Sequence, residues 1–250
     1  MSEVVIKNPH SILAALKNRP KEVLEINLPR DKKDDVWEQI EALANQNKVR
    51  IGASISGVGS TSRGKRPPPP QISGRESSHG AKIKPKSPTS LEVLFSGIDE
   101  RTRGVWLALD SLQDPQNIGA IFRSASFFGI KGIVLTSERS APMTGTVYDI
   151  ASGGVEGVPY VSVINLQRAF EKAKDAGLWI LGTSEHGKES IKSIKNDRPW
   201  LLVVGNEEKG LRRLTEESCD MMCTIPSAEN VVGSLNVSVA TGILLSYLTF

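Results

Sequence analysis

The feature that most constrains how this chain can fold is an alternation of short apolar runs with helical segments, from Gly104 to the C-terminus. The predicted strands are Val105–Leu109, Gly132–Leu135, Trp179–Gly182, Leu201–Val204 and Met222–Ile225. The predicted helices are Ile118–Phe128, Leu166–Ala176 and Val237–Leu248. Gly129 is placed to end the first helix. Strands that alternate with helices predict an α/β domain built on a mostly parallel sheet.

The part of the chain before this alternation divides into a compact region and a linker. Residues 1–56 predict a small α/β unit, because an apolar run at Val23–Leu28 precedes Asp35–Gln46, whose apolar residues recur at helical spacing. Residues 57–103 are the predicted linker, in which glycine, serine and proline are frequent and Pro67–Pro70 is a tetraproline. We therefore expect two folded regions, 1–56 and 104–250, joined by an extended segment.

Basic residues are concentrated in that linker, although the net charge of the whole chain is only +3. From Ser60 to Ser90, seven Lys or Arg residues stand against the single acid Glu76, which gives this segment a net charge of +6. Such a segment attracts a polyanion. A linker that is kept soluble by its charge explains the same composition equally well.

Composition and cysteine content limit the compartment and the cofactors. No apolar run approaches the roughly 18 residues that a membrane span needs, and Met1–His10 has no secretory signal. Two cysteines, Cys219 and Cys223, suit a reducing compartment. We expect a cytoplasmic protein with no membrane partner, and a mitochondrial location is the alternative. The histidines lie far from these cysteines in the sequence, so no metal site is predicted.

Two nucleotide-binding motifs are excluded by the residues that stand in their places. Gly59–Lys65 nearly matches a phosphate-binding loop, but Arg66 replaces the magnesium-binding hydroxyl and prolines follow where a helix should begin. A dinucleotide-binding oxidoreductase needs G-x-G-x-x-G after its first strand, whereas Val105–Leu109 continues into Asp-Ser-Leu-Gln-Asp-Pro.

Three loops carry the candidate site, because open α/β sheets bind ligands at the carboxyl ends of their strands. The first loop runs from Asp110 into the predicted helix. Asn117 is placed to cap this helix, and capping alone would explain it. Arg123 stands among small and apolar helix residues, where a guanidinium needs an anionic partner. A surface arginine with a partly buried stem is the alternative interpretation.

The other two loops follow later strands. Gly205–Gly210 has a glycine at each end, which lets the backbone turn sharply and approach a ligand closely, and Glu207 lies between them. The third loop leaves its strand at Ile225 and delivers Ser234 and Asn236 to a predicted helix N-terminus. Such a terminus favours anions, and helix capping would also explain both residues.

In their order and their amino-acid sequences, these three loops resemble those of the SpoU family of RNA ribose methyltransferases, which is part of a knotted methyltransferase superfamily. The resemblance covers Val105 to the C-terminus, in the motifs LDSLQDPQNIGAIFRSA, VVGNEEKGLRRL and IPSAENVVGSLNVSVATGILL. The intervening SERSAPMTGTV and VPYVSVINLQRA are similar to the group that methylates guanosine in bacterial and mitochondrial large-subunit rRNA. The N-terminal unit is similar to that group's small, ribosomal-protein-like substrate-binding domain.

The chain departs from this group at a few positions. Ser227 follows Pro226 where the relatives usually have Ile-Pro-Met, and His79-Gly80 lacks the glutamine of their His-Gln-Gly. The proline-rich basic insertion is a further difference. These departures bear on the RNA target more than on the reaction.

The resemblance implies a deep trefoil knot in residues 104–250 and a small N-terminal α/β domain that binds RNA, the expected partner. It implies S-adenosylmethionine as the cofactor, held by backbone groups near Thr183, Gly205, Ile225 and Leu235. It also implies a homodimer that packs partly through the last helix.

The implied reaction is methyl transfer to a ribose 2′-hydroxyl, with Arg123 as the catalytic residue. Arginine keeps its proton at neutral pH and is a poor base. We therefore expect Arg123 to orient the adjacent phosphate and stabilise the developing alkoxide, with the phosphate as a proton acceptor. The resemblance assigns positioning roles to Asn117, Glu207, Ser234 and Asn236, and a purely structural role for Glu207 fits equally well.

A guanosine of large-subunit rRNA is the expected target, and tRNA is the main alternative. A non-catalytic RNA-binding or ribosome-assembly protein is the rival from another functional class. The presence of Asn117, Arg123 and Glu207 together argues against this rival.

Overall fold

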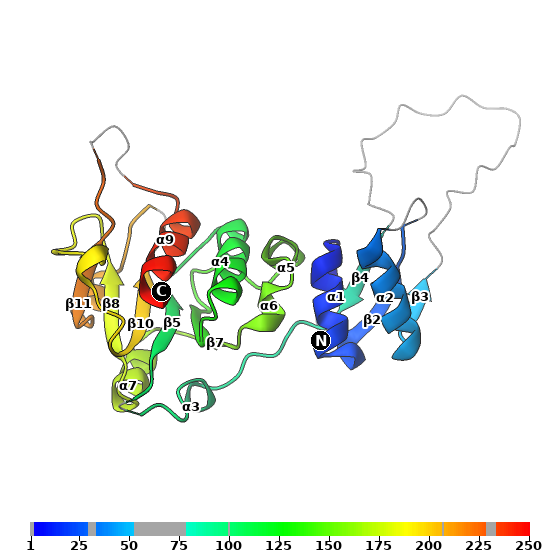
Figure 1. Cartoon of the computed structure of the whole chain (residues 1–250), viewed down its shortest axis with the longest axis horizontal. Coiled ribbons are helices and arrows are strands. Elements are labelled where there is room, and N and C mark those ends of the chain that lie inside the picture. Colours follow the sequence, from blue (N-terminus) through cyan, green and yellow to red (C-terminus); the bar gives the residue numbers. More distant parts are fainter. Residues whose placement is uncertain (1–2, 30–33, 53–78, 100, 207, 229–233) are drawn as a thin grey trace, which may run out of the picture. The chain divides into compact units, whose positions relative to one another are not determined.

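The structure is a computed structural model that describes residues 3–29, 34–52, 79–99, 101–206, 208–228 and 234–250. The chain divides into two compact units, Met1–Lys84 and Pro85–Phe250 (Figure 1). Residues 57–78 and Glu100 of the predicted linker lie outside the described residues, as does Glu207.

The first unit is a four-stranded sheet with the strand order β1-β4-β2-β3. β4 pairs antiparallel with both β1 and β2, and β2 pairs parallel with β3. Two helices, α1 and α2, pack against each other, and the side chains of Asn8 and Asp34 cap their first turns. The elements are β1 Val4–Ile6, α1 Pro9–Asn18, a 3₁₀ turn at Pro20–Glu22, β2 Val23–Asn27, α2 Asp35–Gln46, β3 Arg50–Gly52 and β4 Gly80–Ile83.

The predicted extent of the linker, 57–103, is wrong at its C-terminal side. β4 lies between β1 and β2, and its Ala81 and Ile83 are buried in the core of the first unit. The alternation of these residues with Lys82 and Lys84 is a short strand pattern inside a basic, proline-rich stretch. The first unit therefore extends beyond residue 56, and a short helix, α3 Leu91–Leu94, belongs to the second unit.

The second unit is a seven-stranded sheet with the order β7-β6-β5-β10-β8-β11-β9. Every strand pair in it is parallel, which confirms the predicted α/β class. Its strands are β5 Gly104–Leu109, β6 Gly132–Thr136, β7 Tyr160–Val163, β8 Trp179–Thr183, β9 Glu189–Ser190, β10 Pro199–Val204 and β11 Met221–Thr224. Its other helices are α4 Pro115–Phe127, α5 Gly145–Ala151, α6 Gly154–Gly157, α7 Gln167–Asp175, a 3₁₀ turn at Ile191–Ser193, α8 Arg213–Glu217 and α9 Val237–Thr249.

Helices cover both faces of this sheet. Residues of α3 and α7 pack on one face, in a core that includes Trp106, Ala108, Leu201 and Val203. On the other face, α9 packs on β5 and α4 packs on α9 (Figure 1). All six residues of β10 are buried. Burial on both faces explains why the central strands are continuous apolar runs rather than alternating ones.

The helix α4 begins earlier in the chain than the sequence predicted. Its N-cap is Asp114, whose carboxylate accepts a hydrogen bond of 2.8 Å from the amide of Gln116. Pro115 occupies the first helical position, where its missing N–H costs nothing. Asn117 therefore does not cap α4 but lies within its first turn. The predicted end is confirmed, because Gly129 adopts φ +68° just after the helix.

Candidate functional site

Residues predicted to hold the cofactor lie at the carboxyl ends of three neighbouring strands. The strands β10, β8 and β11 are adjacent and parallel, so their carboxyl ends meet at one edge of the sheet. Thr183 is the last residue of β8, Gly205 follows β10 and Ile225 follows β11. The structure thus brings these three residues to one edge. Leu235 lies just before α9, with 49% of its surface exposed.

The loop after β10 is closed tightly by its own backbone. Asn206 and Gly210 exchange two backbone hydrogen bonds of 3.0 Å, and Gly210 has φ +65°. A Cβ atom on Gly205 would overlap the backbone of Gly210. Only glycine therefore fits at position 205, which agrees with the close backbone approach expected from the sequence.

Asn117 and Asn236 join the first and third predicted loops. The Asn236 side-chain oxygen accepts hydrogen bonds from the amides of Ser238, at 2.9 Å, and Val239, at 3.4 Å, and so caps α9. Its side-chain nitrogen donates a 3.0 Å hydrogen bond to the side-chain oxygen of Asn117. Asn117 is buried at the start of α4. One pair of amides therefore connects the first turns of α4 and α9.

Arg123 lies farther along α4 with its side chain exposed. Within the part of the chain that the structure describes, its guanidinium makes no ion pair or hydrogen bond, so the anionic partner expected from the sequence is not supplied there. Its helix is held firmly, because α4 packs against α5, α6 and α9. Ser234 is exposed, two residues before the α9 cap.

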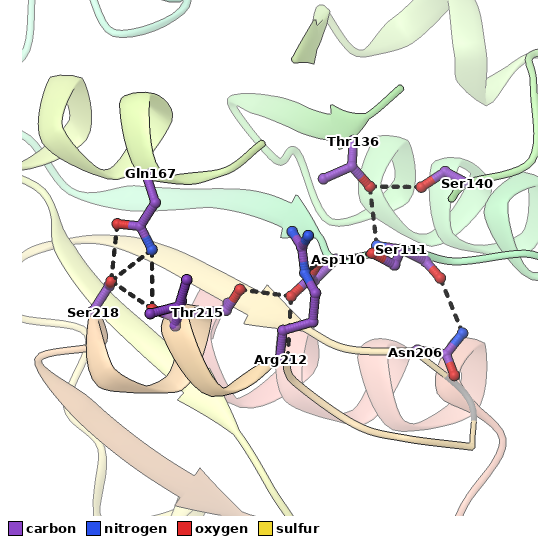
Figure 2. A network of polar contacts seen from close by, with 10 residues as sticks. Asp110, Ser111, Thr136, Ser140, Gln167, Asn206, Arg212, Thr215 and Ser218 are labelled. Atoms are coloured by element: carbon purple, nitrogen blue, oxygen red, sulfur yellow. Dashed lines mark hydrogen bonds and ion pairs between the residues drawn. The ribbon is translucent and has the colours of Figure 1, made fainter. Parts of the chain in front are cut away.

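A buried polar network at the end of β5 was not predicted from the sequence (Figure 2). Asp110 is fully buried, and its carboxylate forms an ion pair of 2.7 Å with Nε of Arg212. It also accepts hydrogen bonds from the hydroxyls of Thr215, at 2.7 Å, and Ser111, at 3.0 Å. The partners compensate the cost of burying the charge, and they fix the segment after β10 to the end of β5.

The backbone at Ser111 joins three loops of the same sheet edge. Ser111 has φ +63°, a left-handed conformation that is uncommon for residues other than glycine. Its amide donates to the hydroxyl of Thr136 at 3.0 Å, and its carbonyl accepts from the side chain of Asn206, also at 3.0 Å. Figure 2 shows these contacts converging from the ends of β5, β6 and β10.

A second group of contacts anchors α8 to α7. The Gln167 side-chain nitrogen donates hydrogen bonds of 3.0 Å to the Leu214 carbonyl and the Ser218 hydroxyl, as Figure 2 shows in part. Because Thr215 on the same helix binds Asp110, α8 is tied at once to α7 and to β5. A polar residue after an apolar strand, such as Asp110, is the one sequence signal that could have pointed to this network.

The two cysteines are free thiols, Cys223 within β11 and Cys219 just before that strand. Burial raises the pKa of Cys219 to about 12, and nearby Asp220 adds to the effect. Burial alone raises the pKa of Cys223 to about 12. Both thiols are therefore neutral at physiological pH and are poor nucleophiles.

No helix in the described parts of the chain is long and apolar enough to cross a membrane.

The sequence of this chain matches a protein-family model and several named proteins. The model of the SpoU rRNA Methylase family matches residues 104–246. A Pseudomonas putida protein named 23S rRNA (guanosine-2′-O-)-methyltransferase RlmB is 34% identical, over 94% of this chain and 92% of its own length. The Neisseria meningitidis protein of the same name is 33% identical, over 95% of this chain and 91% of its own.

A solved structure with the same fold is that of the SpoU methyltransferase AviRb from Streptomyces viridochromogenes, in complex with the cofactor AdoMet. It superimposes with a TM-score of 0.77 and 22% identity, and the match covers 99% of this chain and 89% of AviRb. At this identity the likeness shows a shared fold over both units.

Proposed function

This chain belongs to the SpoU rRNA methylase family, and from that premise we propose that it methylates the ribose 2′-hydroxyl of a guanosine in large-subunit rRNA, with S-adenosylmethionine as methyl donor. The observation that carries the proposal is the likeness, over nearly the whole chain, to bacterial 23S rRNA guanosine-2′-O-methyltransferases. The likeness includes the first unit, which we assign to RNA binding. The cytoplasmic location expected from the sequence stays a prediction.

The carboxyl ends of β10, β8 and β11 fit S-adenosylmethionine. Thr183, Gly205 and Ile225 offer backbone amides and carbonyls from adjacent segments, and such groups can hydrogen-bond an adenine edge without a charged side chain. The tight contact at Gly205 keeps this surface free of a side chain. Leu235 would add backbone groups from the loop before α9. S-Adenosylmethionine supplies the methyl group on a cationic sulfur.

Arg123 is the residue that we assign to the reacting ribose. Its guanidinium is exposed and has no ion pair with any described residue, so it is available to bind a phosphate of the RNA through two parallel hydrogen bonds. Its positive charge would stabilise the negative charge that develops on the 2′-oxygen. A phosphate oxygen then accepts the hydroxyl proton.

The remaining predicted residues position this arrangement. The hydrogen bond between Asn117 and Asn236 sets the start of α4, which carries Arg123, relative to the start of α9. Ser234 precedes α9 on an exposed segment and is assigned to the ribose or its phosphate. Glu207 is assigned to holding the second loop, with a part in the chemistry as the alternative.

A homodimer and a trefoil knot complete the proposal. Val239 and Tyr247 on α9, and Phe250 directly after it, are exposed apolar side chains that lie outside the buried face of the helix. Such an apolar stripe favours a protein partner, and we assign it to a second copy of the chain. The strand order supports the knot, because β10 inserts between β5 and β8, both of which precede it in the chain.

Transfer of a labelled methyl group from S-adenosylmethionine to unmodified 23S rRNA and to tRNA tests the function. We expect transfer to rRNA and a fall in kcat/KM of about 10²-fold or more for Arg123→Ala, because a preorganised charge is lost from the transition state. Arg168→Ala on α7 is the matched control, since that arginine is also exposed.

Undiminished transfer by Arg123→Ala would remove Arg123 from the chemistry. Transfer to tRNA alone would show that the assigned RNA class is wrong.

A further inference from the structure

A cavity of about 180 Å³ lies where the loops after β5, β6 and β10 meet. Its lining includes Ser111, Gln113, Arg139, Glu208, Lys209 and Arg212, none of which has a part in the chemistry assigned above. We propose that this cavity binds a backbone phosphate of the substrate RNA, at a subsite separate from Arg123. The inference rests on the proposed function and names a further contact between the enzyme and its substrate.

The charges around the cavity favour an anion. Among the described residues that line it, Arg139, Lys209 and Arg212 are basic and Glu208 is acidic, and Arg212 is also paired with the buried carboxylate of Asp110. Arg139 and Lys209 are exposed, and within the described residues their side chains form no ion pair. Arg212 contacts Asp110 through Nε and its backbone amide, and it also lines the cavity. A phosphate accepts hydrogen bonds from just such groups.

The cavity wall has an uncommon backbone conformation. Arg139 has φ +59° and Ser111 has φ +63°, and they are two of only four non-glycine residues with positive φ among those described. Such conformations cost energy and persist where the surrounding structure enforces them, often at functional sites. The finding that both residues line one cavity indicates that its shape serves a ligand.

Hydrogen bonds hold the backbone of the cavity wall in place before any ligand arrives. The hydroxyl of Thr136 contacts that of Ser140 at 2.6 Å, next to Arg139 in the chain. The amide of Ala141 donates to the carbonyl of Leu112 at 2.8 Å. The loop that carries Arg139 is thus fixed to the loop that carries Ser111. A preorganised site loses less conformational entropy on binding.

The position of the cavity favours RNA over a free anion. Asn206, which binds the Ser111 carbonyl and also lines the cavity, directly follows Gly205 in the proposed cofactor loop. An anion held here lies beside the edge at which methyl transfer is proposed. A polynucleotide brings a phosphate with every ribose, and phosphate contacts set the register of the bound strand. The subsite would therefore help to place the target ribose.

The test is equilibrium binding of unmodified 23S rRNA at a series of salt concentrations, with the variants Arg139→Gln, Lys209→Gln and their double. We expect roughly tenfold weaker RNA binding for the double variant. We also expect a salt-dependence slope lower by about 1, since neutralising one phosphate contributes roughly 0.7 to 0.9 to it. In methyl transfer the loss should appear in KM rather than in kcat. Lys131→Gln is the control, because Lys131 is exposed at the opposite end of the sheet.

Unchanged affinity and slope in the double variant, with normal methyl transfer by the wild type, would overturn the subsite and leave the proposed function standing. A reduced slope together with no methyl transfer by the wild type to any RNA would support the anion subsite while the proposed function fails. Because the substituted side chains are exposed, thermal unfolding should stay at the wild-type temperature. If Lys131→Gln weakened RNA binding as much as the double variant does, the loss would come from the net charge of the protein and not from this cavity. That result would also overturn the proposal.

Discussion

Asp110 is a buried carboxylate whose neighbours determine what it does. An unpaired buried charge costs several kcal/mol, but Arg212 and the hydroxyls of Thr215 and Ser111 satisfy this one. The same contacts hold Arg212 at the wall of the proposed phosphate subsite. A single carboxylate thus links the folding of β5 and α8 to the charge presented at the sheet edge.

The two buried thiols should lower the free energy of unfolding at alkaline pH. Burial raises the pKa of Cys219 and Cys223 to about 12 in the folded chain, whereas an unfolded thiol titrates near its ordinary value of about 8.5. Between these values the unfolded chain binds fewer protons, so the free energy of unfolding should fall as pH rises from about 9 to 12. Below pH 8 the two thiols should contribute no such slope.

Denaturant titrations at pH 7.5 and pH 10 measure this slope. Comparison with the Cys219→Ala, Cys223→Ala double variant isolates the thiols from other groups that titrate at high pH. The variant should lose less stability than the wild type between the two values. An identical pH dependence in both proteins would contradict the burial argument.

Helix ends illustrate what local sequence determines. Gly129 ends α4 as predicted, with φ +68°, and the amide of Ile130 donates to the Ala125 carbonyl at 2.9 Å. At the end of α2, Lys48 makes the same turn with φ +55°, and the amide of Val49 donates to the Ala44 carbonyl at 2.9 Å. The motif is the same, but only one of the two positions has glycine.

Exchanging these residue types should change stability in opposite directions. Lys48→Gly should raise the free energy of unfolding of the first unit by about 1 kcal/mol, because a left-handed residue with a Cβ is strained. Gly129→Ala should lower that of the second unit by about the same amount. Thermal or denaturant unfolding of both variants checks the prediction. Destabilisation by Lys48→Gly would show that the Lys48 side chain, and not its backbone, matters.

The elements that local sequence patterns do not predict are those that form through contacts with residues far away in the chain. The buried central strands were predicted because continuous apolar runs are a local signal. β4 was missed, since its four residues become a strand only between β1 and β2. The sequence pattern predicts too late a start for α4 because Asn117 is also a residue that favours caps, whereas Asp114 and Pro115 fill the cap and the first helical position. The Asp110 network joins residues more than a hundred positions apart, which no local pattern encodes.

At the scale of the whole molecule, α9 presents an apolar stripe that the described chain does not cover. Phe250 is 91% exposed, and the centroid of its ring lies 5.9 Å from that of Phe128. Phe127, the last residue of α4, is 82% exposed. The stripe thus continues from α9 onto the end of α4. The proposed homodimer would bury it.

Charges on this stripe should prevent association. The variant Val239→Glu, Tyr247→Glu should elute and scatter light as a monomer, whereas the wild type should behave as a dimer. Val93→Glu on α3 is the control, because Val93 is also an exposed apolar residue but lies outside the stripe. A wild-type monomer, or a variant that remains dimeric, would contradict the assignment of this surface.

The atom that receives the methyl group is the central claim, because the family, the sheet edge and the role of Arg123 all converge on it. The most direct test is to digest rRNA methylated in vitro by the wild-type protein to nucleosides and to identify the labelled product by mass spectrometry. We expect 2′-O-methylguanosine, and we expect it to be absent when Arg123→Ala replaces the wild type. A guanosine methylated on its base, or a labelled product that is the same with Arg123→Ala, would contradict it.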